Sequence, residues 1–188
     1  MRKKEKNNLF FFFSGFIFII IIFIVVFKSD GENKSEDFKE SYLSETKVIA
    51  FKTARSFNLL PSVILAQSAL ESSFGSSKLS KDYNNYFGIK SKSKNGVKLD
   101  TVEYIDQEEK ILSESFRVYK SKAESFTDYG RLITEAQRYE KVREARDYKE
   151  ACRALQDGGY ATDPSYADKI ISIIEKYELY KLDEEMIN

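Results

Sequence analysis

Two glutamates are the residues of this chain whose surroundings best suit acid chemistry. Glu71 ends the largely apolar stretch 61–70, shortly before Gly75, and Glu103 lies in the alternating stretch 97–104. A carboxyl group held among apolar side chains has a raised pKa and can donate a proton near neutral pH. A pair of carboxyl groups can hydrolyse a glycosidic bond, because one protonates the leaving oxygen and the other stabilises the charge on the sugar. Taken singly, each glutamate also fits a solvated position on an ordinary helix or strand.

The composition removes several other catalytic chemistries. The chain has no histidine and one cysteine, Cys152. A Cys–His dyad, a Ser–His–Asp triad, a histidine-ligated zinc site and an internal disulfide are therefore excluded. We expect neither a metal nor a cofactor. Cys152 lies in the helical pattern 149–155, where we expect a small buried or half-buried hydrophobe.

Two tyrosines and one asparagine could contact a sugar. Tyr160 and Tyr166 flank the turn 161–164, and a tyrosine offers a flat face for stacking and a hydroxyl for hydrogen bonding. Asn85 could bind an acetamido group through its amide. The alternatives are two core or rim aromatic residues at a helix start and an ordinary turn asparagine. Asp163 is expected to cap the helix that follows it.

The N-terminal segments predict a membrane anchor. Residues 1–8 are basic, and residues 9–27 are apolar except for Ser14 and Gly15, which is long enough to cross a hydrocarbon core as a helix. The basic segment would stay in the cytoplasm and place the rest of the chain outside. No Ala-x-Ala pattern follows the apolar run, which favours an uncleaved anchor over a signal peptide. Residues 28–41 are polar and predict a flexible tether.

The charge balance gives no sign of a nucleic-acid partner. Residues 1–27 carry four basic and one acidic side chain, out of 30 of each in the chain. The remaining residues therefore carry 26 basic and 29 acidic groups, which is no basic footprint for nucleic acid.

Residues 42–182 predict one folded domain, followed by a tail at 183–188. Helical spacing indicates a helix that Ser44 caps, a second helix starting at Pro61 and ending near Glu71, and further helices after Ser121. Between them, the alternating stretches 97–104 and 111–119 predict a small β-lobe near 97–119. The expected helices of the C-terminal part cover residues 139–146, 147–157 and the segment after Asp163. We expect an α+β fold that is predominantly helical.

Four stretches together resemble one family. They are Ala69–Gly75 (ALESSFG), Asn85–Lys90 (NYFGIK), Phe116–Tyr119 (FRVY) and Gly159–Ala167 (GYATDPSYA). Their order and separations are similar to those of the bacterial endo-β-N-acetylglucosaminidases of glycoside hydrolase family 73, which include cell-wall autolysins and the flagellar glucosaminidase domain. The resemblance covers roughly residues 44–180. It implies a lysozyme-like fold with a β-lobe and hydrolysis of peptidoglycan glycan strands after N-acetylglucosamine.

The resemblance also implies roles for individual residues. Glu71 matches the catalytic acid, and Glu103 matches the β-lobe glutamate proposed as second carboxylate. The matching motifs suggest that the substrate contacts Asn85, Phe87, Tyr160 and Tyr166. The acetamido group of the substrate could replace the second carboxylate as nucleophile. A lytic transglycosylase with one glutamate and a non-catalytic wall-binding module are the alternative functions.

Overall fold

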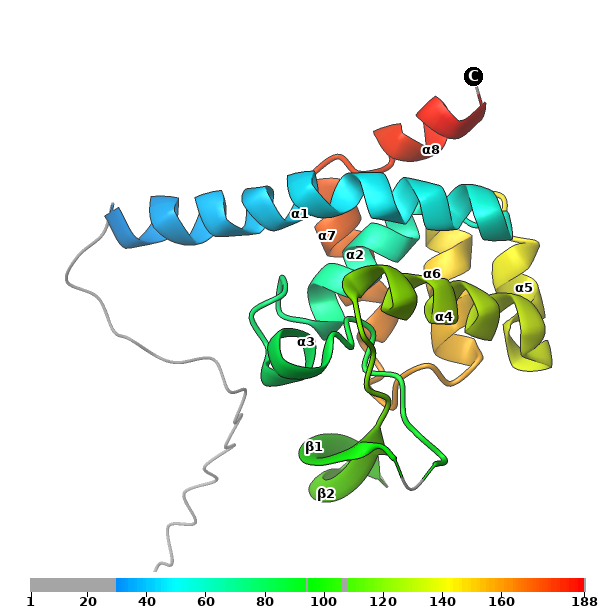
Figure 1. Cartoon of the computed structure of the whole chain (residues 1–188). Coiled ribbons are helices and arrows are strands. Elements are labelled where there is room, and N and C mark those ends of the chain that lie inside the picture. Colours follow the sequence, from blue (N-terminus) through cyan, green and yellow to red (C-terminus); the bar gives the residue numbers. More distant parts are fainter. Residues whose placement is uncertain (1–29, 94, 106–107, 188) are drawn as a thin grey trace, which may run out of the picture.

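The computed structural model describes residues 30–93, 95–105 and 108–187 (Figure 1). Two strands, β1 (Val97–Ile105) and β2 (Glu108–Phe116), form one antiparallel hairpin. The helices are α1 (Asp30–Phe57), α2 (Pro61–Glu71), α3 (Lys78–Tyr83), α4 (Lys122–Glu135), the short 3-10 helix η1 (Gln137–Tyr139), α5 (Glu140–Arg143), α6 (Tyr148–Asp157), α7 (Tyr166–Lys176) and α8 (Lys181–Ile187). This architecture confirms the predicted class, a mostly helical fold with a small sheet.

Helix α1 begins earlier than the sequence predicted. The tether expected over 28–41 is helical from Asp30 onward, and the chain continues in the same helix to Phe57. Glu36 forms ion pairs with Lys39, at 3.9 Å on the same helix, and with Lys176 of α7, at 2.8 Å. The polar residues that suggested a flexible segment therefore have partners along the helix and on a neighbouring one. Such exposed ion pairs each contribute little to stability. Here they add to a helix whose later turns are already packed in the core.

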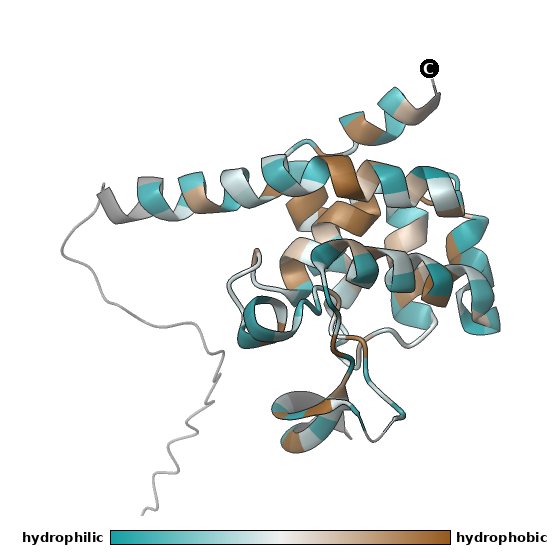
Figure 2. Cartoon of the chain, viewed as in Figure 1, coloured by the Kyte–Doolittle hydropathy of each residue, from teal (hydrophilic) through white to brown (hydrophobic). Residues whose placement is uncertain are grey.

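Helix α2 is the centre of the core. Every residue from Pro61 to Ala69 is buried, and α2 packs against α1, α7 and α8. Figure 2 shows hydrophobic residues gathered on the central helices, while the outer face of α1 is mostly hydrophilic. Pro61 occupies the first turn, where its missing N–H costs nothing. The apolar run read from the sequence is thus a fully enclosed helix that delivers Glu71 at its C-terminal end.

Helix α8 closes the N-terminal end of α2. The carboxylate of Asp183 accepts hydrogen bonds from the backbone N–H of Ser62, at 2.9 Å, and from the Ser62 hydroxyl, at 2.6 Å. It acts as a helix cap contributed from a distant segment, because Leu60 at the N-cap position offers no side-chain acceptor. The residues from Asp183, predicted as a tail, therefore include part of the folded domain.

Replacing Asp183 with alanine is expected to lower the free energy of unfolding by about 1–2 kcal/mol, since Ser62 is fully buried and would lose both acceptors. Urea unfolding measures this loss. Glu185→Ala is the matched control on the same helix, because Glu185 makes an exposed ion pair with Lys47 and should cost less than about 0.5 kcal/mol. Equal losses in the two variants would contradict the capping role.

The β-hairpin is joined to the helical body at its base. β1 pairs with β2 from Val97 opposite Phe116 to Ile105 opposite Glu108. The Ser91 N–H donates to the Ser115 carbonyl at 2.7 Å, which extends the pairing beyond β1. In Figure 1 the hairpin extends away from the helices. The strands expected over 97–104 and 111–119 are thus present, with β2 displaced toward the N-terminus.

The helices after residue 120 begin in two different ways. Ser121 and Asp147 accept hydrogen bonds from the backbone N–H groups three residues later, as helix caps do. Asp163 instead accepts from the Ser165 N–H at 2.8 Å and contacts the ammonium group of Lys169. It closes a turn that precedes α7, so the helix begins at Tyr166 rather than next to Asp163.

The predicted membrane segment 9–27 lies outside the residues that the structure describes. Within the described ranges, no helix combines the length and the apolar character needed to cross a membrane. The anchor therefore stays a prediction from the sequence.

Candidate active site

Glu71 sits at a helix end that local hydrogen bonds close. It is the last residue of α2, and it is half-buried. The following turn passes through three consecutive left-handed residues, Ser73, Phe74 and Gly75. The Ser72 hydroxyl accepts from the Gly75 N–H at 2.7 Å and donates to the Ser68 carbonyl at 2.6 Å. This local hydrogen bonding satisfies the helix terminus, so that the carboxylate of Glu71 is held at a defined place.

The two predicted tyrosines lie beside Glu71. The Tyr166 hydroxyl donates to Oε1 of Glu71 at 2.7 Å, although 95 residues separate them in the chain. The rings of Tyr160 and Tyr166 are stacked, with centroids 5.8 Å apart and an angle of 9° between their planes. The Tyr160 hydroxyl donates to the backbone carbonyl of Phe87 at 2.9 Å. The structure thus brings together the helix end, the segment before α7 and the loop around Phe87.

Both tyrosines remain protonated in this site. Burial is the main reason that the pKa values of Tyr160 and Tyr166 lie well above the ordinary tyrosine value, and the negative charge of Glu71 raises them further. The Tyr166 hydroxyl therefore keeps its proton and remains a hydrogen-bond donor to Glu71.

These raised pKa values predict a loss of stability at alkaline pH. A group whose pKa is higher in the folded state stabilises that state below its unfolded pKa, and this contribution is lost as the pH rises. Above about pH 10, each such tyrosine should lower the free energy of unfolding by about 1.4 kcal/mol per pH unit. Urea unfolding between about pH 7 and about pH 11 tests this. The decline should be shallower for Tyr166→Phe, and an unchanged slope would contradict the assignment.

Asn85 and Phe87 occupy places unlike those that the sequence predicted. Asn85 is 1% exposed, and its amide donates to the carbonyls of Ile89 and Arg117, both at 3.0 Å, while its oxygen accepts from the Ile89 N–H at 3.1 Å. Phe87 is 0% exposed and stacks on Tyr129 at 4.1 Å between centroids. Neither side chain presents surface to a sugar, which corrects the expected substrate contacts. Both residues shape the loop that passes Glu71.

That loop approaches the carboxylate of Glu71 at Gly88. Gly88 has a φ of +62°, and a Cβ atom placed on it would lie 3.2 Å from Oε2 of Glu71. A glycine is therefore favoured both by the left-handed backbone and by the space that the carboxylate occupies. No role for Gly88 was predicted from the sequence, and its signal was the glycine one residue after Phe87 in the stretch NYFGIK.

The sequence of this domain matches a described protein family. The model of the Glucosaminidase family, described as mannosyl-glycoprotein endo-beta-N-acetylglucosaminidase, matches residues 47–179. The chain belongs to this glucosaminidase family. The match confirms the resemblance to glycoside hydrolase family 73, and it places the domain among glycoside hydrolases.

Relatives of the glucosaminidase domain are similar in sequence and in structure. The exo-glucosaminidase LytG of Bacillus subtilis is 42% identical over 134 residues, which cover 68% of this chain and 48% of LytG. A peptidoglycan hydrolase mutant from Sphingomonas sp. A1 has a TM-score of 0.68 at 38% identity and covers 76% of this chain and 96% of that one. The catalytic domain of the autolysin Auto from Listeria monocytogenes has a TM-score of 0.65 at 32% identity. The match covers 85% of this chain and 100% of that domain. The chain spans about half the length of the curated relatives that it matches first.

Glu103 is placed by its backbone alone. It lies in β1 of the glucosaminidase domain, opposite Lys110 of β2. Its side chain falls outside what the structure describes. The second carboxylate therefore stays a prediction from the sequence and the resemblance.

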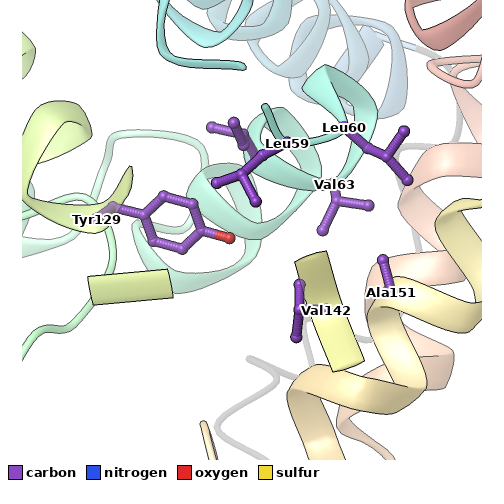
Figure 3. Close-up of a pocket in the computed structure, with 7 residues that line it drawn as sticks. Leu59, Leu60, Val63, Tyr129, Val142 and Ala151 are labelled. Atoms are coloured by element: carbon purple, nitrogen blue, oxygen red, sulfur yellow. The ribbon is translucent and has the colours of Figure 1, made fainter. Parts of the chain in front are cut away.

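The other candidate features of the glucosaminidase domain do not suit a ligand. Within residues 30–93, 95–105 and 108–187, no group of acidic, cysteine or histidine side chains could hold a metal ion. A cavity of about 10 Å³ lies among α2, α4, α5 and α6 (Figure 3). Apolar side chains and the ring of Tyr129 line it, and its volume is about that of one water position. Cys152 is fully buried, as predicted, and burial raises the pKa of its thiol to about 12.

Proposed function

We propose that this domain hydrolyses the β-1,4 bond after N-acetylglucosamine in peptidoglycan, as an endo-β-N-acetylglucosaminidase that remodels the cell wall. The observation that carries the proposal is the half-buried Glu71, which ends an apolar helix and accepts a hydrogen bond from Tyr166. Membership of the glucosaminidase family and likeness to a peptidoglycan hydrolase and to an autolysin support this substrate.

Each residue has a defined part in the proposed reaction. Glu71, in its protonated form, gives its proton to the oxygen of the leaving sugar, and the bond between that oxygen and the anomeric carbon breaks. Glu103 activates the attacking water or stabilises the positive charge on the sugar ring, unless the substrate's acetamido group supplies that help. The stacked pair of Tyr160 and Tyr166 supports the site next to Glu71. No step requires a metal or a cofactor.

Product analysis tests the proposed bond specificity. Purified glycan strands are digested, and the new chain ends are identified by mass spectrometry. Reducing N-acetylglucosamine ends on internal fragments support the proposal, while release of single residues from strand ends would indicate the exo mode named for LytG. Anhydro-muramic ends would indicate a lytic transglycosylase, and wall binding without new ends would indicate a non-catalytic module. Exo release, anhydro-muramic ends and binding without new ends would each overturn the proposed reaction.

We further propose that the domain works on the outer side of the cell membrane, anchored by residues 9–27 with residues 1–8 in the cytoplasm. The sequence supports this, because the basic residues 1–8 precede the apolar run 9–27. The full chain should stay with membranes after a carbonate wash, and external protease should digest its catalytic domain in spheroplasts. A protein released by the wash, or one protected from the protease, would contradict this location.

A further inference from the structure

A continuous chain of buried hydrogen bonds leads from helix α4 to Glu71. The Tyr129 hydroxyl donates to Oε1 of Gln67 at 2.6 Å. Nε2 of Gln67 donates to the Tyr166 hydroxyl at 2.8 Å, and this hydroxyl donates to Glu71 at 2.7 Å. Gln67 is 0% exposed, and Tyr129 and Tyr166 are nearly as deeply buried. Gln67 lies one turn before Glu71 on α2, so both ends of the path through Tyr166 rest on the same helix.

The chain has a direction, because Tyr166 has one proton to give. When Glu71 is ionised, its oxygen accepts a hydrogen bond from the Tyr166 hydroxyl, and the Tyr166 oxygen can then only accept a hydrogen bond from Gln67. The amide of Gln67 consequently turns its Nε2 toward Tyr166 and its Oε1 toward Tyr129. The Tyr129 hydroxyl, as a donor, fits only this orientation of the amide. Without that donor, the amide could turn over. Its Oε1 would then compete with Glu71 for the hydrogen bond that the Tyr166 hydroxyl donates.

We propose that Gln67 and Tyr129 are positioning residues of the glycosidase, which orient the Tyr166 hydroxyl toward Glu71 and thereby set the pH range over which Glu71 can act as the acid. The inference rests on the proposed function of Glu71. A hydrogen bond donated to the ionised carboxylate stabilises that form, and successive bonds in a buried chain strengthen one another.

The position of Gln67 favours this role over simple packing. The other residues from Pro61 to Ala69 are apolar or small, and a buried amide is costly unless its hydrogen bonds are made. Leucine or methionine would fill a similar volume in α2 without that cost. The ring of Tyr129, by contrast, has a packing role of its own, since it stacks on Phe87. Only its hydroxyl belongs to the hydrogen-bonded chain, so the two roles can be separated by a substitution.

The tyrosine hydroxyls near Glu71 stay protonated near neutral pH. Three titratable side chains interact with Glu71 from the packed elements: Tyr129 on α4, Tyr160 in the loop before α7 and Tyr166 on α7. Burial first, and then the charge of Glu71 among nearby groups, raises the pKa of each hydroxyl. None of the three therefore ionises near neutral pH. Glu103 on β1 is not included among these groups, because the structure does not describe its side chain.

The test compares Tyr129→Phe with wild type in the pH dependence of kcat and KM on purified glycan strands. The expected result is a shift of the alkaline limb to higher pH by about half a unit to one unit, the size of one lost hydrogen bond, with KM unchanged. Gln67→Met should shift the limb at least as far. Tyr139→Phe is the matched control, because Tyr139 is equally buried and near Tyr160, but its hydroxyl is not in the chain. A limb that moves no further in Tyr129→Phe than in Tyr139→Phe overturns the proposal.

A second measurement separates this proposal from the proposed function. The carboxyl carbon of Glu71 can be followed by 13C NMR in a pH titration of the folded protein, without any substrate. The midpoint should rise in Tyr129→Phe and stay in place in Tyr139→Phe, even if the wild-type protein releases no sugar ends. In that case the proposed reaction would fail while the positioning role would stand. Unchanged midpoints in both variants would remove the positioning role itself.

Discussion

Glu71→Gln is expected to lower the rate of peptidoglycan hydrolysis by about 10²–10⁴-fold, the contribution of a positioned general acid. Glutamine has nearly the shape of glutamate, and its oxygen can still accept the hydrogen bond that Tyr166 donates at 2.7 Å. The fold around the helix end should therefore persist, while the proton for the leaving oxygen is missing. The loss should appear in kcat, because the proton is transferred in the transition state.

The measurement is the release of new reducing ends from cell walls, together with a zymogram. Glu135→Gln is the matched control, because Glu135 is also the last residue of its helix, α4, but is exposed. It should retain the activity of wild type. A Glu71→Gln protein that clears cell walls like the control would rule out Glu71 as the acid.

The elements around the site could be predicted because their signals are local. The apolar run ending at Glu71 identified α2, and period-two alternation from Val97 identified the hairpin. The helix starts after Ser121 and at Asp147 required only neighbouring residues, and the structure shows that both side chains cap their helices. The resemblance implied that Tyr166 contacts the substrate, but its contact with Glu71 came from the structure, because no local pattern reports a contact between residues 95 positions apart.

The structure departs from the sequence prediction where a distant partner decides the role of a residue. Asn85 carries the groups that would suit an acetamido sugar, but the carbonyl of Arg117 and its own loop use them. The polar start of α1 has a partner on α7, and Asp183 has one on α2. Gln67 was part of an otherwise apolar run, and its role depends on hydrogen bonds with two tyrosines from other helices. Each of these roles follows from tertiary contacts that composition and spacing do not encode.

Gly88→Ala is expected to reduce hydrolysis by about tenfold or more, through the position of Glu71. The new Cβ would lie 3.2 Å from Oε2 of Glu71, so the carboxylate or the loop must move by a few tenths of an ångström. Oε1 is held by Tyr166, which limits how far the carboxylate can turn. Because a displacement of about 1 Å can cost a hundredfold in rate, a smaller displacement should still be clearly measurable.

Gly159→Ala separates the displacement from backbone strain. Gly159 has a φ of +68°, close to the +62° of Gly88, but a Cβ atom there would meet nothing within 4 Å. Both variants should lose about 1 kcal/mol or more of unfolding free energy, since alanine is strained in the left-handed region. Only Gly88→Ala should also lose activity per folded molecule. If the two variants lose activity equally, the strain rather than the contact with Glu71 is responsible. If Gly88→Ala keeps full activity, the loop does not constrain the carboxylate, and the acid must owe its position to α2 and Tyr166 alone.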